Sequence, residues 1–203
     1  MVLRLFGYNS SLYESGQFQK IIQISQTNNL YKYGRLIGGI KVTNFQSFSG
    51  VITMISDFAT GINEEAGCNK LVSVDNGYGA LVNFVMTPDT YVVDYVMLSV
   101  GDRITGFYDI DTPAPLIFPP QFRAIVMAKD TPYQNIKVSY FNSQLESSDG
   151  KLKLNIAPST QIVLRNGQAF TRYPSNRNLI VVYGHTTKSI PAQTTPYKII
   201  VIC

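Results

Sequence analysis

The sequence is poor in the residues on which most enzyme sites depend. It has no tryptophan and a single histidine, His185, and only 15% of its 203 residues are charged, against roughly 25% in ordinary soluble domains. A Ser/His/Asp site of the hydrolase type would need a serine on a G-x-S-x-G turn, and this run does not occur. We therefore predict that the chain is not an enzyme, has no catalytic residues, uses no cofactor and carries His185 in a loop.

Metal-binding spacings are also missing. The two cysteines, Cys68 and Cys203, have neither a CxxC partner nor supporting histidines. Carboxylates that could gather at a calcium or glycosidase site are Asp57, Glu64, Glu65, Asp109 and Asp111, but Asp109-Ile110-Asp111 lacks the longer acidic register of a calcium loop. We predict no metal site. The cysteines are either independent thiols or disulfide-bonded, within one chain or between chains.

Long apolar runs are absent as well. No stretch approaches the about 18 apolar residues that a transmembrane helix needs. The first residues, MVLRLFGYNSSLYESGQ, lack the long apolar core of a secretory signal. The polar character comes instead from Asn, Gln, Ser, Thr and Tyr, a composition that suits a crowded or extracellular surface. We expect a location at the cell or spore surface, reached without a classical signal peptide.

The few charges that are present form three blocks. Residues 1–48 carry five basic side chains and one acidic, residues 49–130 carry four and ten, and residues 131–203 carry eight and two. The net charges are therefore +4, −6 and +6. Opposite charge on the last two blocks favours docking within the chain or head-to-tail contact between chains. A nucleic-acid reader would be basic in both blocks, so this pattern argues against nucleic acid.

One stretch of the chain occurs twice. VNFVMTPDTYVV, starting at Val82, aligns without a gap on LKLNIAPSTQIV, starting at Leu152, and pairs Pro88 with Pro158 and Thr90 with Thr160. ITGFYD then aligns on LIVVYG, and RAIVMA on KIIVIC, each after a Pro-containing loop. The sequence therefore predicts two copies of one β unit, with the two proline corners in the same position of each copy.

The composition supports a folded chain made of strands. Hydrophobic residues make up 45% of the sequence, and short apolar runs are separated by Gly, Pro and Asn-Gly turns. We predict an all-β fold of two repeated small β-barrel or sandwich units, 49–130 and 131–203, after an N-terminal extended arm, 1–48. One predicted strand is Tyr91–Met97. The expected core is Val51, Ile55, Val82, Phe84, Val92, Ile104, Phe107, Ile125 and Met127 in the first unit, and Ile136, Leu152, Leu154, Ile156, Ile162, Leu164, Ile180, Val182, Ile199 and Val201 in the second.

The arm carries more apolar surface than an unstructured tail. It holds eight aromatic residues, and its run FQKIIQIS, Phe18–Ser25, is rich in β-branched side chains. We expect it to become ordered by adding a strand to a sheet, in its own chain or in a neighbour. A simple subdomain packed on the first unit is the alternative. The residues predicted to carry self-association are Phe18, Ile21, Ile22, Ile24, Tyr31 and Tyr33.

Two family resemblances accompany this reading. The runs GVITMI, VNFVMTPDT and VGDRITGFYD resemble small Greek-key barrels of the OB type found in bacterial envelope and secreted proteins. The runs GCNKLVSV, PPQFRAIVMAKD and SIPAQTTP resemble an uncharacterised family of spore-forming Firmicutes. The resemblance covers about three quarters of the chain, leaves out the arm and implies the tandem OB-like fold. It implies no activity and no site residues.

The function expected from these features is structural. We predict a non-enzymatic protein that associates with copies of itself through its arm, as an oligomer or filament, in a fibre at the cell or spore surface. The alternative is a monomeric binding module for an oligosaccharide, a peptide or a single-stranded nucleic acid, since OB-type barrels bind such ligands. The residues that would favour a nucleic acid are Lys137, Lys151, Lys153, Arg165, Arg172, Arg177 and Lys188, with Tyr140, Phe141, Phe170 and Tyr173 between them.

Overall fold

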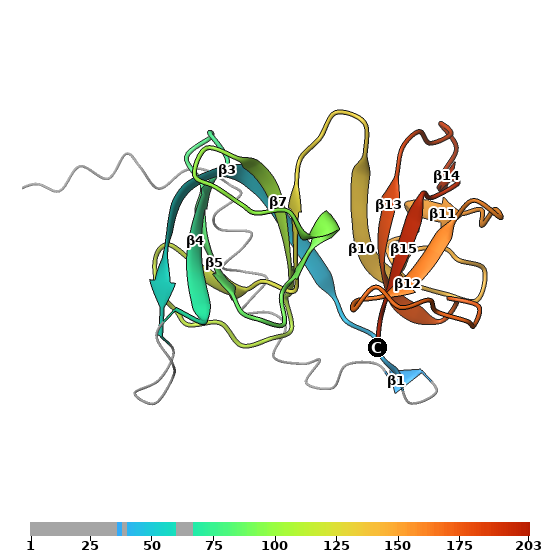
Figure 1. The fold of residues 1–203 in the computed structure, drawn as a ribbon, viewed down its shortest axis with the longest axis horizontal. Helices are drawn as coiled ribbons and strands as arrows, with labels where there is room; N and C mark the ends of the chain where they lie inside the picture. Colours follow the sequence, from blue (N-terminus) through green and yellow to red (C-terminus); the bar gives the residue numbers. More distant parts are fainter. Residues whose placement is uncertain (1–35, 38–39, 60–66) are drawn as a thin grey trace, which may run out of the picture. The chain divides into compact units, whose positions relative to one another are not determined.

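A computed structural model describes residues 36–37, 40–59 and 67–203 of the chain. In this part the secondary structure is almost entirely β-strand, with one short 3-10 turn, η1 (Val93–Tyr95), so the predicted all-β class is confirmed (Figure 1). No helix among the described residues is long and apolar enough to cross a membrane. A two-residue pair, β1 (Leu36–Ile37) and β2 (Ile40–Lys41), precedes the larger sheets.

The first unit is a seven-stranded sheet whose order along the sheet is β6-β9-β7-β3-β4-β5-β8. Its strands are β3 (Phe45–Phe58), β4 (Asn69–Asp75), β5 (Leu81–Met86), β6 (Tyr91–Val92), β7 (Arg103–Asp109), β8 (Gln121–Arg123) and β9 (Val126–Lys129). The long strand β3 pairs with β7 through its first half and with β4 through its second half. It also crosses residue 48, so the predicted boundary of the arm falls inside a strand.

The second unit divides its strands between two sheets. A four-stranded sheet has the order β10-β13-β15-β12, and a two-stranded sheet pairs β11 with β14. The strands are β10 (Asn135–Phe141), β11 (Leu152–Leu154), β12 (Gln161–Leu164), β13 (Arg177–Tyr183), β14 (Ala192–Thr194) and β15 (Lys198–Ile202).

The two units repeat one pairing scheme. The order β6-β9-β7-β3 in the first unit corresponds to β12-β15-β13-β10 in the second, and the parallel pair β5 with β8 corresponds to β11 with β14. The outer pairs β6 with β9 and β12 with β15 are both parallel, while β7 with β9 and β13 with β15 are both antiparallel. The predicted repeat-like architecture is therefore confirmed.

The proline corners are built by the same hydrogen bonds in both units. After Pro88, the Thr90 hydroxyl accepts from the Thr87 N–H at 2.9 Å and donates to the Ala124 carbonyl at 2.8 Å. After Pro158, the Thr160 hydroxyl accepts from the Ala157 N–H at 3.2 Å and donates to the Pro196 carbonyl at 2.9 Å. Both units carry a threonine at this position because its hydroxyl group closes the corner in each. The sequence therefore shows Thr90 aligned with Thr160.

Two predictions about strands were wrong. The last strands align as Val126–Lys129 on Lys198–Val201, because Tyr91 pairs with Val126 and Gln161 with Lys198. The sequence alignment of RAIVMA on KIIVIC was therefore three residues out of register. The predicted strand Tyr91–Met97 ends at Val92 and passes into η1, where Asp94 has a φ of 57° and Tyr95 a φ of 53°. Such left-handed angles end a strand.

The predicted core is partly confirmed. The prediction that Val51 is buried was wrong, since Val51 is 37% exposed while Ile52 beside it is buried. The cause is a bulge between Ile52 and Met54, which reverses the side-chain alternation assumed for Val51 and Ile55. Eleven of the predicted residues are buried: Val82, Phe84, Ile104, Phe107, Met127, Leu152, Leu154, Ile180, Val182, Ile199 and Val201. The others are only half-buried: Ile55, Val92, Ile125, Ile136, Ile156, Ile162 and Leu164.

Three apolar clusters hold the described part together. One contains only residues of the first unit, around Phe84 and Ile104, and another only residues of the second, around Leu154 and Ile199. The third cluster joins the units. It combines Tyr91, Val93, Phe107, Val126 and Ala128 with Val138, Val163, Ile180, Val182 and Ile200. Phe107, Ile180 and Val182, predicted as cores of single units, lie in this shared cluster.

Candidate functional site

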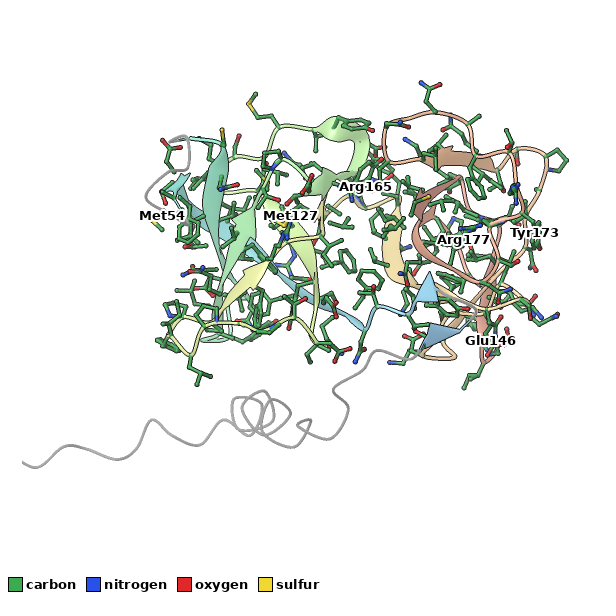
Figure 2. The ribbon with its side chains drawn as sticks, turned by 90° about the horizontal axis from the view of Figure 1, so that it is seen from below. Met54, Met127, Glu146, Arg165, Tyr173 and Arg177 are labelled. Carbon is green, nitrogen blue, oxygen red and sulfur yellow. The ribbon has the colours of Figure 1, made fainter. Side chains whose placement is uncertain are left out.

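The two units meet through equivalent faces. Phe107 on β7 occupies the position that Val182 occupies on β13, and Ala128 on β9 the position of Ile200 on β15, as their strand registers show. All four side chains are buried in the shared cluster. Polar contacts continue the shared cluster at one side, where Lys198 lies 3.6 Å from the Asp94 carboxylate. Arg165, labelled in Figure 2, donates there to the Asp89 carbonyl. Here the opposite charges of the two blocks contact each other within one chain.

At the other side the contact opens into a cleft of about 470 Å³, which we call the junction cleft. The second unit offers apolar side chains to the contact at Ile136, Val138 and Ile180, while the equivalent first-unit positions are hydroxyl residues. These are Ser47, Ser49 and Thr105. Because short hydroxyl side chains fill less space than Ile or Val and hold water, the faces separate where these residues lie.

The hydroxyl side chains of the junction cleft form a short hydrogen-bonded row. The oxygens of Ser49 and Thr105 lie 2.8 Å apart, and the Thr105 hydroxyl donates to Asp130 Oδ1 at 2.9 Å. Asp130 also faces the Arg103 guanidinium at 3.4 Å. This row fixes the first wall of the cleft as a polar surface with its hydroxyls already oriented.

The second wall of the junction cleft is a sheet edge. β10 is the terminal strand of its sheet, and its residues Asn135, Ile136, Lys137 and Val138 line the cleft. Only the end of β10 gains backbone partners on its outer side, where Ser148 N–H donates to the Tyr140 carbonyl at 2.8 Å. Among the described residues, the outer edge of 135–139 therefore has no strand beside it. An edge of this kind can accept an added strand.

A charged cluster stiffens the turn behind this edge. Lys137 forms an ion pair with Asp149, whose other oxygen accepts from the Ser147 hydroxyl at 2.6 Å. Partial burial alone would raise the pKa of Asp149, but hydrogen bonds from Lys137, Ser147 and the Lys151 N–H outweigh it and lower the pKa below its ordinary value. Burial, with a smaller contribution from Asp149, raises the pKa of the Tyr183 phenol in the cleft wall.

These contacts predict a pH-dependent contribution of Asp149 to stability. Because folding lowers its pKa, the contribution is fully present above the unfolded-state pKa of about 3.9 and is lost as the pH falls through the folded value. We expect Asp149→Asn to lower the urea midpoint at pH 7. The difference from wild type should shrink below about pH 4. An equal difference at pH 7 and pH 3 would show that ionised Asp149 is not the stabilising group.

A second concavity, the first-unit groove, lies away from the cleft and has a volume of about 700 Å³. Its apolar lining includes Phe58, Val85 and Phe122, and the proline loop at Pro113 and Pro115 forms one wall. Phe122 is stacked on Tyr108 with ring centroids 4.1 Å apart, so the aromatic floor is fixed. The polar rim carries Asp89, which lies 3.2 Å from Arg123.

The second unit has no equivalent of this groove chemistry. At the positions that match Val85, Asp89 and Phe122, it carries Asn155, Ser159 and Thr194. Asn155 donates to Gln193 at 3.2 Å and buried Thr194 donates to the His185 carbonyl at 2.8 Å, so these side chains bond within the unit. The groove is therefore a feature of one copy, although the proline corner beside it is shared by both.

The residues singled out in the sequence fall into three groups. Phe18, Ile21, Ile22, Ile24, Tyr31 and Tyr33 lie outside the described residues. Cys68 and Cys203 are both exposed thiols, and no disulfide joins them within the chain. His185 is exposed just after β13, which confirms its predicted place in a loop. In the described part, no three His, Cys, Asp or Glu side chains gather as they would around a metal ion.

Sequence reasoning missed both concavities. The junction cleft depends on Ser47, Ser49 and Thr105, which look like ordinary solvent-facing positions of alternating strands. A residue-by-residue comparison of the two copies could have found them, because each matches an apolar residue of the second unit. The groove had no such signal, since its lining comes from segments far apart in the chain.

Comparison with known proteins adds no relative. No protein-family model matches the chain, and no curated protein matches it. The resemblance to a family of spore-forming Firmicutes stays an expectation, on which these comparisons have no bearing.

Proposed function

We propose that this chain is a non-enzymatic structural protein that associates with copies of itself through its N-terminal arm. The observation that carries the proposal is the outer edge of β10 in the junction cleft, beside which none of the described strands lies. A strand contributed by the arm would hydrogen-bond to residues 135–139 and lie against the hydroxyl row of the first unit. If the arm comes from a neighbour, each copy both donates and accepts, and the contact repeats as a filament, as in a fibre at a cell or spore surface.

The chemistry of the cleft suits an added strand. Backbone groups at a sheet edge give affinity without requiring one sequence. The hydroxyl oxygens of Ser49 and Thr105, whose protons are donated along the row toward Asp130, can accept hydrogen bonds from polar side chains of the added strand. The run FQKIIQIS alternates in part between polar and β-branched residues, which suits one polar and one apolar neighbour. We therefore assign Ile21, Ile22 and Ile24 to the donated strand, with Phe18, Tyr31 and Tyr33 flanking it.

The same proposal includes a finer description of the fold. We propose that each unit is a small OB-like barrel, and a β-solenoid is the competing description of these strands. In the first unit, support for the barrel comes from the strand pairing. Residues 81–92 run parallel to 121–129, β4 and β7 flank this pair, and both pair with β3. The second unit repeats this pairing except beside β10, the terminal strand of its sheet. A solenoid would instead place parallel strands of successive coils side by side.

The arm proposal is tested by Ile22→Pro in the full chain, with Ile22→Val as the matched control. Proline cannot donate to a ladder, whereas valine keeps the β-branched character of the site. Light scattering after gel filtration should show higher oligomers for wild type and Ile22→Val. The oligomers should be reduced or absent for Ile22→Pro. Assembly of Ile22→Pro at the wild-type level would refute the role of the arm.

Hydrogen exchange locates the acceptor independently. In a strand every second N–H points to the same side, and the Tyr140 backbone faces the outer edge of β10, so within 135–139 the outward amides are those of Ile136 and Val138. In the assembled protein these two amides should exchange at least about tenfold more slowly than in Ile22→Pro, because each new ladder bond protects an amide. Amides of β15, a central strand, serve as an internal reference, since they are paired in either state. Assembly without added protection on β10 would place the arm on another edge.

The first-unit groove favours a second candidate function. A concavity of about 700 Å³ with an apolar floor and a polar rim has the form of a binding site for an oligosaccharide, a peptide or a single-stranded nucleic acid. The one arginine in the lining, Arg123, is paired with Asp89 at 3.2 Å, so the groove offers no cluster of basic side chains for phosphate groups and a nucleic acid fits least well. In this alternative the chain is a monomer that binds such a ligand through the groove, and it has no structural role.

A further inference from the structure

A short loop of the second unit projects an apolar and a basic residue into solvent. The side chain of Ile190 is 96% exposed, and Lys188 is exposed two residues earlier. Large aliphatic side chains exposed to this degree at a loop tip are candidates for contact with another molecule. The loop also belongs to the +6 block of the chain.

This loop is held in shape by its own hydrogen bonds. The hydroxyls of Thr187 and Ser189 lie 2.7 Å apart, and the Ser189 hydroxyl donates to the Pro191 carbonyl at 2.7 Å. Thr187 and Gln193 are joined by both a backbone bond at 2.9 Å and a bond from the Gln193 N–H to the Thr187 hydroxyl at 2.9 Å. Because the loop is already ordered, binding through it costs less conformational entropy.

The first-unit groove has the chemistry that this loop needs. Its floor of Val85, Phe58 and Phe122 can take an aliphatic side chain, and its rim carries the Asp89 carboxylate, whose side chain is 78% exposed. The unit around it has a net charge of −6. An isoleucine on the loop therefore matches the apolar floor of the groove. The exposed Asp89 carboxylate, which lies 3.2 Å from Arg123, has room for the loop lysine as a second cationic partner.

We propose that the loop carrying Lys188 and Ile190 docks in the first-unit groove of a second copy of this chain. Ile190 fills the apolar floor and Lys188 pairs with Asp89. The contact rests on the proposed self-association in that it joins copies of the chain, but it uses neither the arm nor the junction cleft. Because the loop and the groove are different surfaces, each copy offers one of each, and the contact either continues from copy to copy or closes where two copies exchange loops.

The strength of this contact follows from its size. One loop in one groove buries far less surface than a stable interface of about 1,600 Å², so a single contact is weak. Attraction between the −6 and +6 units adds to it at low ionic strength and is screened by salt. Where the arm also joins two copies, the loop contact acts at high effective concentration and strengthens the assembly.

A charge-reversal experiment in full-length Ile22→Pro protein tests the loop contact without the arm. Lys188→Glu places two carboxylates opposite each other, and Asp89→Lys places two ammonium groups opposite each other, so either change should weaken association at least about tenfold at low salt. Mixing the two variants, or combining both changes in one chain, restores opposite charges and should recover association. Lys151→Glu alters the block charge equally at an exposed lysine outside the loop and is the control.

Sedimentation velocity at low salt, with protein up to the millimolar range, reads each outcome. The contact is supported if both single changes weaken association, Lys151→Glu largely preserves it and the mixture restores it. A monomeric Ile22→Pro protein overturns it and leaves the arm as the only contact. Association unaffected by Lys188→Glu or Asp89→Lys also overturns it, as does failure of the mixture to recover. If wild type and Ile22→Pro are both monomeric, the proposed function fails as well.

Discussion

Replacing Gly106 with valine should unfold the first unit or cost it at least about 3 kcal/mol of unfolding free energy. A Cβ atom at this position of β7 would lie 2.6 Å from two ring atoms of Phe84, closer than atoms can pack. The ring cannot move aside, because Phe84 is fully buried in the centre of the first-unit cluster. Urea denaturation followed by circular dichroism measures the loss.

The second unit supplies the compensating change for this experiment. At the positions of Phe84 and Gly106 it carries Leu154 and Val181, a smaller residue against a larger one, and both are buried. We therefore expect Phe84→Leu combined with Gly106→Val to be more stable than Gly106→Val alone. A double-mutant cycle should show coupling of at least about 1 kcal/mol. Additive losses would mean that the two units do not fill their interiors in the same way.

Shortening Ile180 to alanine should destabilise both units together by about 2–5 kcal/mol. Ile180 is fully buried in the shared cluster, where it packs with residues of both units such as Phe107 and Ile200. The cavity it leaves therefore weakens the contact that makes the units unfold as one. Calorimetry should show one transition for wild type, and for Ile180→Ala a lower Tm with a broadened or divided transition.

The control for this change is Ile190→Ala, because Ile190 is 96% exposed and loses no packing within its own chain. Its effect on the unfolding free energy of dilute, monomeric protein should stay within about 0.5 kcal/mol. Equal losses for Ile180→Ala and Ile190→Ala would contradict the assignment of Ile180 to the contact between units.

Local chemistry decided which parts of the fold the sequence could predict. The corners at Pro88 and Pro158 were predictable because each threonine two residues later bonds back to its own corner. The last strands were not, since VMA and IIV are both short apolar runs and nothing local fixes their register. Val51 was misassigned because the bulge that reverses the alternation of β3 leaves no distinctive residue in the sequence.

The candidate site was less predictable than the fold. Whether a serine such as Ser49 faces solvent or another unit depends on how the units pack, and this packing is decided by the apolar side chains of the shared cluster, such as Phe107 and Val182. The open edge of β10 was equally hidden, because an edge is defined by which strand is missing beside it. The arm, if it adds a strand, needs a sheet edge to pair with, and among the described strands β10 has such an edge.

Sedimentation velocity of the full-length wild-type chain, at rising concentration and low salt, measures self-association itself. Species heavier than the 22.6 kDa monomer should appear and grow with concentration, and added salt should remove the part due to the opposite charges of the two units. A sedimenting species of 22.6 kDa at every concentration and at low salt would contradict the proposed self-association.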